Sequence, residues 1–420
     1  MAVMKPGLMP ILQQGDGRLL FGTRMVRLFA YGYLSLVLVL YLVQVGLSET
    51  QIGLLLSLTL LGDTLISLWL TSIADRVGRR RILIAGAILM IFAGLLFALT
   101  RNFYLLLAAA TVGVISPSGY EVGPFLSVEQ AALSQIIPDQ FRTEVFAWYN
   151  LVGTLATAVG AMIGGVSVQA FEYISLGSLG SYRAVVAGYA VLGLVMVILF
   201  SRLSPSVEAA SIGRQTISHL IPGARFGLGR SRGIVLKLSA LFSLDAFAGG
   251  FIMQSIVAYW FFVRFNVAPA TLGAIFFGAN ILAALSYLAA AHIASRIGLV
   301  RTMVFTHIPS NLLLVLVPLM PNLLLAIMVL LVRFSISQMD VPTRQSYTMA
   351  VVTPEERSAA AGITGIARTI GASLAPLFVG PMLASTALLN LPFFLAGGLK
   401  IVYDLALYRC FKTLRPPEEA

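Results

Sequence analysis

Residues Ala74 to Arg81 read Ala-Asp-Arg-Val-Gly-Arg-Arg-Arg, a dense block of positive charge between two long apolar runs. Each run is long enough to cross a bilayer, which takes roughly 20 apolar residues in a helix. Arginine-rich loops stay on the cytoplasmic side of a membrane, so this turn is predicted to be cytoplasmic. A fainter copy, Ala294 to Arg301, reads Ala-Ser-Arg-Ile-Gly-Leu-Val-Arg. It indicates that one half of the chain repeats the other.

The composition is that of a membrane protein. Of the 420 residues, 58% are hydrophobic and 11% are charged, whereas soluble proteins have about 25% charged residues. The apolar runs are continuous rather than alternating, which favours helices over a barrel. We predict an all-α membrane protein with twelve transmembrane helices. The predicted spans are 19–45, 51–74, 82–100, 104–137, 143–170, 182–200, 234–263, 270–295, 302–319, 323–351, 357–383 and 392–411.

The fourth predicted span contains a cluster of helix-breaking residues. Pro117, Gly119, Gly123 and Pro124 lie within eight residues of one another. Such a cluster is tolerated at membrane depth only where the backbone is buried against protein or faces a wet cavity. We therefore expect a break or kink in this span.

A constant shift relates the two halves of the sequence. Moving 215 residues along the chain takes Gln130 to Gln345 and Gly165 to Gly380. Two similar halves joined by a linker are typical of parallel-repeat transporters. We predict an N-terminal six-helix half (1–200), a basic cytoplasmic linker (201–233), a C-terminal six-helix half (234–411) and a cytoplasmic tail (412–420).

The net charge of +11 follows the positive-inside rule and does not indicate nucleic-acid binding. The first twenty residues lack the apolar core and cleavage site of a signal peptide. We therefore expect an inner or plasma membrane protein with both termini in the cytoplasm. Cys410 is the single cysteine, so no internal disulfide can form.

The loop that ends at Arg80 resembles that of the major facilitator superfamily, and the resemblance covers nearly the whole chain. The family pattern is Gly-x-Leu-Ala-Asp-Arg-x-Gly-Arg-Arg, and residues 71–80 read Thr-Ser-Ile-Ala-Asp-Arg-Val-Gly-Arg-Arg. The resemblance implies a conformational latch made of Asp75, Arg76, Gly78 and Arg79. The second copy has Ser295 in place of the acid, so the latch is expected on one side only.

Two signatures of exporters in that family are incomplete here. No Lys or Arg occurs between Arg101 and Arg142, where proton-coupled exporters usually have an Arg. The Gly-Pro-x-x-Gly-Gly motif of the fifth helix is present without its Pro, as Gly-Ala-Met-Ile-Gly-Gly at 160–165. Small residues at these spacings could equally serve close helix packing.

Ionisable residues near the bilayer midplane are functional candidates, because an unpaired charge there costs several kcal/mol. Asp63, Asp245, Arg333 and Arg368 are the candidates for a substrate or proton cavity, with Asp63 and Asp245 the expected partners of the arginines. A buried interhelical pair is an equal alternative. Glu121, in the expected break, is a candidate proton carrier or a residue at a cavity mouth. Lys400 and Asp404 are expected to neutralise each other as i,i+4 neighbours. Further cavity candidates are Tyr31, Gln254 and Asn280.

Glu129 and Arg344 occupy equivalent positions in the two halves at the same shift of 215 residues. Their charges are opposite. We predict a salt bridge between the halves that closes an inner gate.

The sequence contains no motif for nucleotide binding or for a catalytic nucleophile. Its three histidines, His219, His292 and His307, show no metal-ligand spacing. We expect no cofactor, no metal site and no enzymatic activity. The predicted function is secondary active transport of a small-molecule substrate by alternating access, as proton-coupled export of an organic compound by a monomer in a lipid bilayer. The alternatives are an importer or facilitator of a small metabolite, and a membrane sensor or scaffold without transport.

Overall fold

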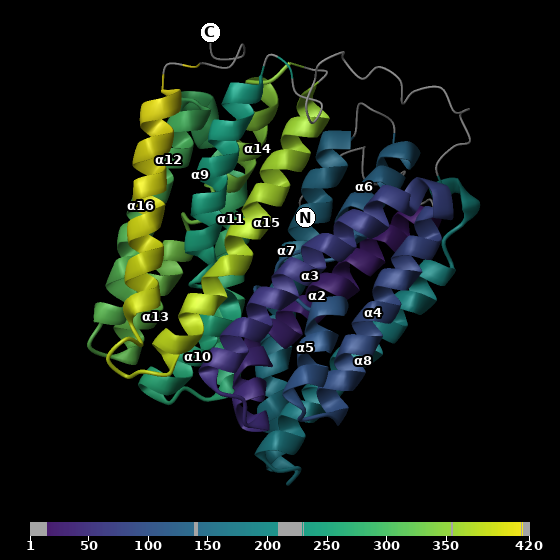
Figure 1. Ribbon diagram of the computed structural model, residues 1–420, viewed down its shortest axis with the longest axis vertical. Coiled ribbons are helices and arrows are strands. Elements are labelled where there is room, and N and C mark those ends of the chain that lie inside the picture. The colour runs from purple at the N-terminus through teal and green to yellow at the C-terminus, as the bar shows by residue number, and fades with distance from the viewer. Residues whose placement is uncertain are drawn as a thin grey trace, which may run out of the picture. The chain divides into compact units, whose positions relative to one another are not determined.

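The computed structural model (Figure 1) describes residues 15–137, 142–208, 229, 231–353, 356–412 and 414. Within these residues the secondary structure is helical, and none of them forms a strand. Most of the predicted linker and tail lies outside the described residues. The continuous helices are α2 (Gly15–Val45), α3 (Glu49–Val77), α4 (Arg79–Leu99), α7 (Arg142–Tyr173), α8 (Ser178–Ser201), α11 (Pro269–Ile297), α12 (Leu299–Leu316, with the 3-10 turn Val317–Leu319), α15 (Arg357–Leu383) and α16 (Leu391–Phe411).

Three further spans are discontinuous. The fourth consists of α5 (Phe103–Val112) and α6 (Phe125–Ile136), which are separated by residues 113–124. The seventh consists of α9 (Arg232–Gly250) and α10 (Gln254–Phe265), and the tenth consists of α13 (Leu323–Phe334) and α14 (Asp340–Ala350). The predicted twelve-span, all-α architecture is confirmed: ten segments are long and apolar enough to cross a membrane, and α5 and α13 are shorter apolar helices within the two remaining spans.

The predicted break in the fourth span is confirmed, and its cause is local. Gly119 and Gly123 have φ angles of +76° and +80°, a region that residues with a Cβ rarely occupy. The segment 113–124, which we call the helix-4 break, therefore leaves the helical path and returns to it at Phe125. The breaks at 251–253 and 335–339 are not expected from sequence.

The turn between α3 and α4 is built on a glycine that recurs in the repeat. Gly78 has φ +110° and precedes α4, and Gly298 has φ +87° and precedes α12. Both positions favour glycine because the left-handed region is strained for other residues. The two copies of the loop motif therefore form the same kind of turn.

Backbone contacts divide the chain into two units. Unit 1 comprises Met1–Ala210 and Gln254–Asn280, and unit 2 comprises Ser211–Met253 and Ile281–Ala420. In unit 1, α2 packs on α7 and α8, α4 on α8, α3 on α5, and α10 on α2; in unit 2, α9 packs on α15 and α16, and α12 on α16 and α14. The division by contacts groups α10 and the first part of α11 with unit 1. The domain boundaries drawn from the repeat stay a prediction.

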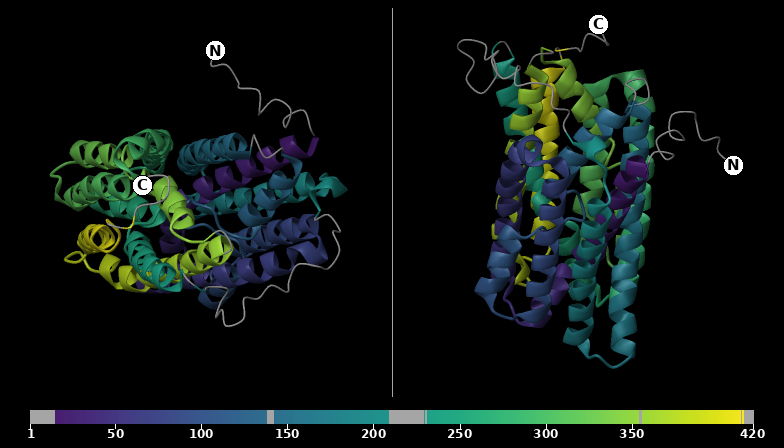
Figure 2. Two further views of the ribbon diagram at one scale, coloured as in Figure 1. Left: turned by 90° about the horizontal axis from the view of Figure 1, so that it is seen from above. Right: turned by 90° about the vertical axis from the view of Figure 1, so that its right-hand side faces the viewer.

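Helices α2 and α7 lie side by side (Figures 1 and 2) because glycines let their backbones approach closely. A Cβ at Gly160 would collide with the Phe29 carbonyl, and one at Gly164 with the Tyr33 carbonyl. From the other side, a Cβ at Gly32 would collide with the Thr157 carbonyl. The small residues at 160–165 therefore serve helix packing, a common use of glycine in membranes.

Gly160→Ala is expected to lower the free energy of unfolding by about 1–3 kcal/mol, because the added methyl group must displace backbone atoms of α2. The measurement is unfolding of purified protein in detergent. Gly22→Ala on α2 is the matched control, since a Cβ there meets no atom within 4 Å and should leave stability equal or slightly higher. Equal destabilisation by both changes would contradict this account of the α2–α7 contact.

Candidate functional site

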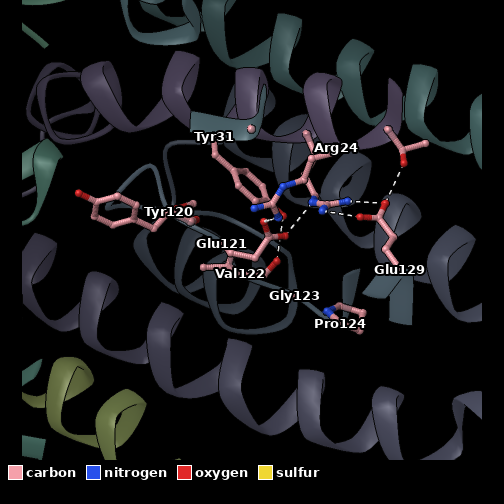
Figure 3. A network of polar contacts seen from close by, with 12 residues as sticks. Arg24, Tyr31, Tyr120, Glu121, Val122, Gly123, Pro124 and Glu129 are labelled. Carbon is pink, nitrogen blue, oxygen red and sulfur yellow. Dashed lines mark hydrogen bonds and ion pairs between the residues drawn. The ribbon is translucent and has the colours of Figure 1, made fainter. Parts of the chain in front are cut away.

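Two arginines of α2 meet two glutamates of the fourth span in unit 1 (Figure 3). Arg27 binds Glu129 through both terminal nitrogens at 2.7 Å each, and its Nε lies 2.8 Å from Oε1 of Glu121. Arg24 forms an ion pair with the other oxygen of Glu121. Arg27 and Glu129 have no exposed surface. The bidentate geometry is the strongest form of such a pair.

Neighbouring side chains complete the bonding of this cluster. Thr23 donates a hydrogen bond to Oε1 of Glu129 at 2.8 Å, and the Tyr149 hydroxyl donates to the other oxygen. The Arg27 guanidinium also lies 4.9 Å from the ring centroid of Phe125, within the range of a cation–π contact. Buried charges are tolerated when hydrogen bonds satisfy them in this way.

The local fold explains why these groups meet. Arg24, Arg27 and Tyr31 recur at the helical spacing that puts them on one face of α2. The helix-4 break frees Glu121 from a helix, so that its carboxylate can lie between the two arginines. The Tyr31 hydroxyl donates to the carbonyl of Val122 at 3.0 Å. In Figure 3, Tyr120 points away from the cluster.

Asp63, at the middle of α3, lies on the other side of the helix-4 break. Its Oδ1 accepts a hydrogen bond from the backbone N–H of Gly123 at 2.7 Å and one from the Ser67 hydroxyl at 3.4 Å. Only 9% of its surface is exposed. Asp63 therefore holds the break in place from α3 while Tyr31 holds it from α2.

Unit 2 contains a second buried cluster of charges. Arg344 on α14 lies 3.1 Å from Asp245 on α9 and 2.9 Å from Asp340 on its own helix. Lys400 on α16 lies 2.5 Å from the other oxygen of Asp245. Arg368 on α15 interacts electrostatically with these groups, and its Nε is buried without a hydrogen bond. The structure thus brings the predicted residues Asp245, Arg344 and Arg368 together.

The predicted pairing of Lys400 with Asp404 is wrong. Lys400 reaches across to Asp245, because its side chain points from α16 toward α9 rather than along its own helix. Asp404 instead contacts Nδ1 of His307 at 2.8 Å and accepts a hydrogen bond from Asn311 at 2.9 Å. A spacing of i,i+4 permits contact but does not require it.

The two clusters join equivalent spans with the charges reversed. In unit 1 the cation Arg27 lies on the first span and the acid Glu129 on the fourth. In unit 2 the acid Asp245 lies on the seventh span, which the repeat equates with the first, and the cation Arg344 on the tenth. Glu129 and Arg344 each have a partner within their own unit, and a bridge between them stays a prediction.

Gln254 and Asn280 lie in a third polar group, which we call the α10 pin. Gln254 donates to the Ser35 hydroxyl of α2 at 3.0 Å, and Asn280 donates to Gln254 at 3.2 Å. The N–H of Ser255 donates to the carbonyl of Pro117 in the helix-4 break at 3.3 Å. The start of α10 thus contacts the break in the fourth span.

Arg333, the remaining cavity candidate, lies at the end of α13. Its side chain is buried, and its guanidinium lies 5.0 Å from the ring centroid of Phe334. Its role as a binding residue stays a prediction.

The predicted latch residues lie at the α3–α4 turn. Arg79 contacts Asp75 at 2.9 Å, and Arg76 is exposed. Glu208, which follows the sixth span, accepts a hydrogen bond from the backbone N–H of Arg79 at 2.6 Å and lies beside Gly78. A carboxylate at a helix N-terminus is favourable. The role of the loop as a latch stays a prediction.

Sequence reasoning missed several residues of these clusters. Arg24 and Arg27 lie at the entry of the first predicted span and are not among the predicted site residues. Their spacing with Tyr31, which puts the three residues on one polar helix face, could have identified them. Asp340 lies four residues before Arg344, an i,i+4 spacing that could have identified the pair. Nothing in the sequence marks Glu208 as a partner of the α3–α4 turn. Within the described part of the chain, no group of three His, Cys, Asp or Glu side chains could hold a metal ion.

Comparison with known proteins gives one consistent family. Residues 20–376 match the Major Facilitator Superfamily. An uncharacterized membrane protein of Saccharomyces cerevisiae, YJR124C, is 33% identical over 93% of both chains. Shorter matches are a Na(+), Li(+), K(+)/H(+) antiporter of Planococcus maritimus, 29% identical over 24% of each chain, and the multidrug resistance protein MdtL of a Shewanella species, 29% identical over 37% of each.

A solved structure shows the same fold. The crystal structure of a mutant of the nucleoside transporter NupG aligns with a TM-score of 0.73 at 15% identity, and the match covers 94% of this chain and 99% of that one. At this identity the likeness concerns the fold alone.

Arg27→Ala is expected to lower the free energy of unfolding by about 3–5 kcal/mol, because it leaves the buried Glu129 carboxylate without its cation. The measurement is thermal or chemical unfolding in detergent. Arg18→Ala, an exposed arginine of the same helix, is the control and should change stability by no more than about 0.5 kcal/mol.

The double change Arg27→Glu with Glu129→Arg tests whether the pair itself is what stabilises unit 1. It restores opposite charges and should be more stable than either single change. A double variant as unstable as the sum of the two single variants would contradict the pairing.

Proposed function

Because this chain belongs to the major facilitator superfamily, we propose that it is a secondary active transporter that exports a small organic compound in exchange for protons. Family membership makes it a multi-pass integral membrane protein that transports small molecules and is not an enzyme. The direction, the coupling ion and the organic nature of the solute are the proposal. So are its location in the inner or plasma membrane with both termini cytoplasmic, and its action as a monomer.

The observation that supports the proposal most is the placement of buried or half-buried charges on broken helices. Asp245 lies on the discontinuous seventh span, Arg344 on the discontinuous tenth, and Glu121 within the helix-4 break. Ionisable groups at membrane depth are costly and mark ion or substrate pathways. Broken helices are where transporters of this kind expose backbone to a ligand. A purely structural protein has no need of either feature.

The α10 pin supports alternating access. It joins α2, the helix-4 break and α10 within unit 1, and Tyr259 adds a hydrogen bond to Glu49 at 3.0 Å at the start of α3. By the positive-inside rule this end of α2 and α3 faces away from the cytoplasm. We assign these contacts to a closed outer gate. They would break when the transporter opens outward.

The names of the relatives favour export over uptake. One matched protein is described as a multidrug resistance protein and another as an antiporter that exchanges alkali cations and protons. A carboxylate at membrane depth without a cation beside it, such as Asp63 among the described residues, is a group that a proton gradient can act on. A proton-driven exporter of an organic solute agrees with both observations.

Transport in sealed proteoliposomes of known orientation tests this function. An imposed proton gradient should drive a solute from a panel of organic cations, anions and neutral drugs in the direction opposite to the protons, while a dye reports internal pH. Protein-free liposomes and Arg18→Ala protein are the controls. Movement of a solute together with protons would indicate an importer, and no movement in folded protein would refute transport of this panel.

Asp75→Asn is expected to slow transport severalfold and to leave solute binding unchanged, if the loop acts as a latch. The Asp75 side chain is 67% exposed, so the change should not unfold the protein. Transport is followed in liposomes and binding in detergent. Glu172→Gln, an exposed acid of α7, should affect neither. An equal loss of binding and transport would contradict the latch.

A further inference from the structure

We propose that Asp63 is a proton-binding site of unit 1, and that its protonation releases the helix-4 break. This inference rests on the proposed proton coupling and identifies the residue that binds the proton. It combines three observations: the position of Asp63, the charge balance of unit 1, and the contact with Gly123.

Asp63 lies at the centre of a transmembrane helix. Helix α3 runs from Glu49 to Val77, and 14 residues, or about 21 Å, separate Asp63 from either end. Its carboxylate is therefore as far from both membrane surfaces as this helix allows. Only 9% of the residue is exposed. An anion at this depth needs a cation, a dense set of hydrogen bonds, or a proton.

The neighbouring charges do not supply a cation. Three carboxylates of unit 1 lie around the helix-4 break, on Asp63, Glu121 and Glu129, and two guanidinium groups, of Arg24 and Arg27, face them. All the ion pairs of the two arginines go to the glutamates. Within the described residues, Asp63 has no ion-pair partner. One proton on Asp63 brings the net charge of these five groups from −1 to zero.

The other groups around Asp63 do not change this balance. The titratable groups that face it are Glu121 from the helix-4 break, Tyr31 from α2 and Tyr189 from α8. Helices α4, α5 and α6 also pack on α3. Among the described residues, no charged side chain of these three helices forms a hydrogen bond or ion pair with Asp63.

The contact with Gly123 links the proton to the shape of the fourth span. The anionic carboxylate accepts a charge-assisted hydrogen bond from the N–H of Gly123 at 2.7 Å. Gly123 has a left-handed φ of +80° and lies two residues before α6 begins. Binding of a proton forms an O–H bond on the carboxylate and removes its charge, so this hydrogen bond weakens. The helix-4 break then loses its tie to α3.

The same movement reaches the arginine cluster and the α10 pin. Glu121 lies two residues before Gly123 and binds Arg24 and Arg27. Pro117, in the same break, accepts the hydrogen bond from Ser255 of α10. A proton on Asp63 is thus connected through one non-helical segment to the charges of α2 and to the contacts that we assign to the outer gate.

The test is Asp63→Asn, which keeps the shape of the protonated side chain but cannot titrate. Infrared difference spectra of purified protein between alkaline and acidic buffer report a protonated buried carboxyl as a C=O band. The wild type should show this band, Asp63→Asn should lack it, and Asp63→Glu should show it at a shifted frequency. Glu172→Gln is the control and should keep the wild-type spectrum. An unchanged band in folded Asp63→Asn would overturn the proposal.

Transport separates this proposal from that of the whole function. Asp63→Asn should lose proton-driven movement of the solute and retain exchange of labelled for unlabelled solute without a gradient. A wild type that shows the band but moves no solute refutes the proposed function and leaves the proton site standing. Asp63→Asn protein that still couples solute to protons refutes the site. A carboxylate signal that responds to Na⁺ at constant pH would identify a sodium site and overturn the proposal.

Discussion

The cost of placing a charge inside a membrane governs the arrangement of this protein. A carboxylate or guanidinium group at that depth must find an opposite charge and enough hydrogen-bond partners, because no water replaces them. Arg27 and Glu129 meet this requirement with two parallel hydrogen bonds and no exposed surface. Their pairing fixes the first span against the fourth. The close approach of α2 and α7 at glycines and the break that brings Glu121 to Arg27 are arranged around this pair.

Unit 2 meets the same requirement with the signs exchanged. Asp245 on the seventh span pairs with Arg344 on the tenth, where unit 1 has an arginine on the first span and a glutamate on the fourth. What the repeat preserves is therefore a pair that joins two helices, and not the residue at either position. An ion pair is insensitive to which helix supplies the cation, so both arrangements satisfy the same constraint. This explains why Glu129 and Arg344 have opposite charges at equivalent positions while each has a partner in its own unit.

The fold could be predicted from sequence almost completely, and the sites only in part. Hydropathy determines the spans, and the Pro and Gly residues of 117–124 reveal the helix-4 break. The first of the two further breaks, 251–253, follows Gly250, which gives no clear signal because this glycine serves close packing on α15: an added Cβ would lie 2.6 Å from the Cβ of Ala375. The second, 335–339, contains no Pro or Gly, and its only sequence signal is Pro342 in the first turn of α14. Helical spacing assigns Lys400 to the wrong acid because it says nothing about a carboxylate on a neighbouring helix. Contacts between distant segments, such as Glu208 with the α3–α4 turn, leave no local pattern.

The helix-4 break has a role that no regular helix could perform. A helix uses its backbone N–H and C=O groups for its own hydrogen bonds, whereas this segment offers them to four different helices. The carbonyl of Val114 accepts a hydrogen bond from Tyr189 of α8 at 2.7 Å. The carbonyl of Val122 is bound by Tyr31 of α2, the N–H of Gly123 by Asp63 of α3, and the carbonyl of Pro117 by Ser255 of α10. Glu121 in the same segment binds the arginines of α2. A change of charge at any of these contacts therefore acts on a single short piece of chain, and the other contacts must adjust to it. Continuous helices on either side would transmit such a change only by moving as rigid bodies.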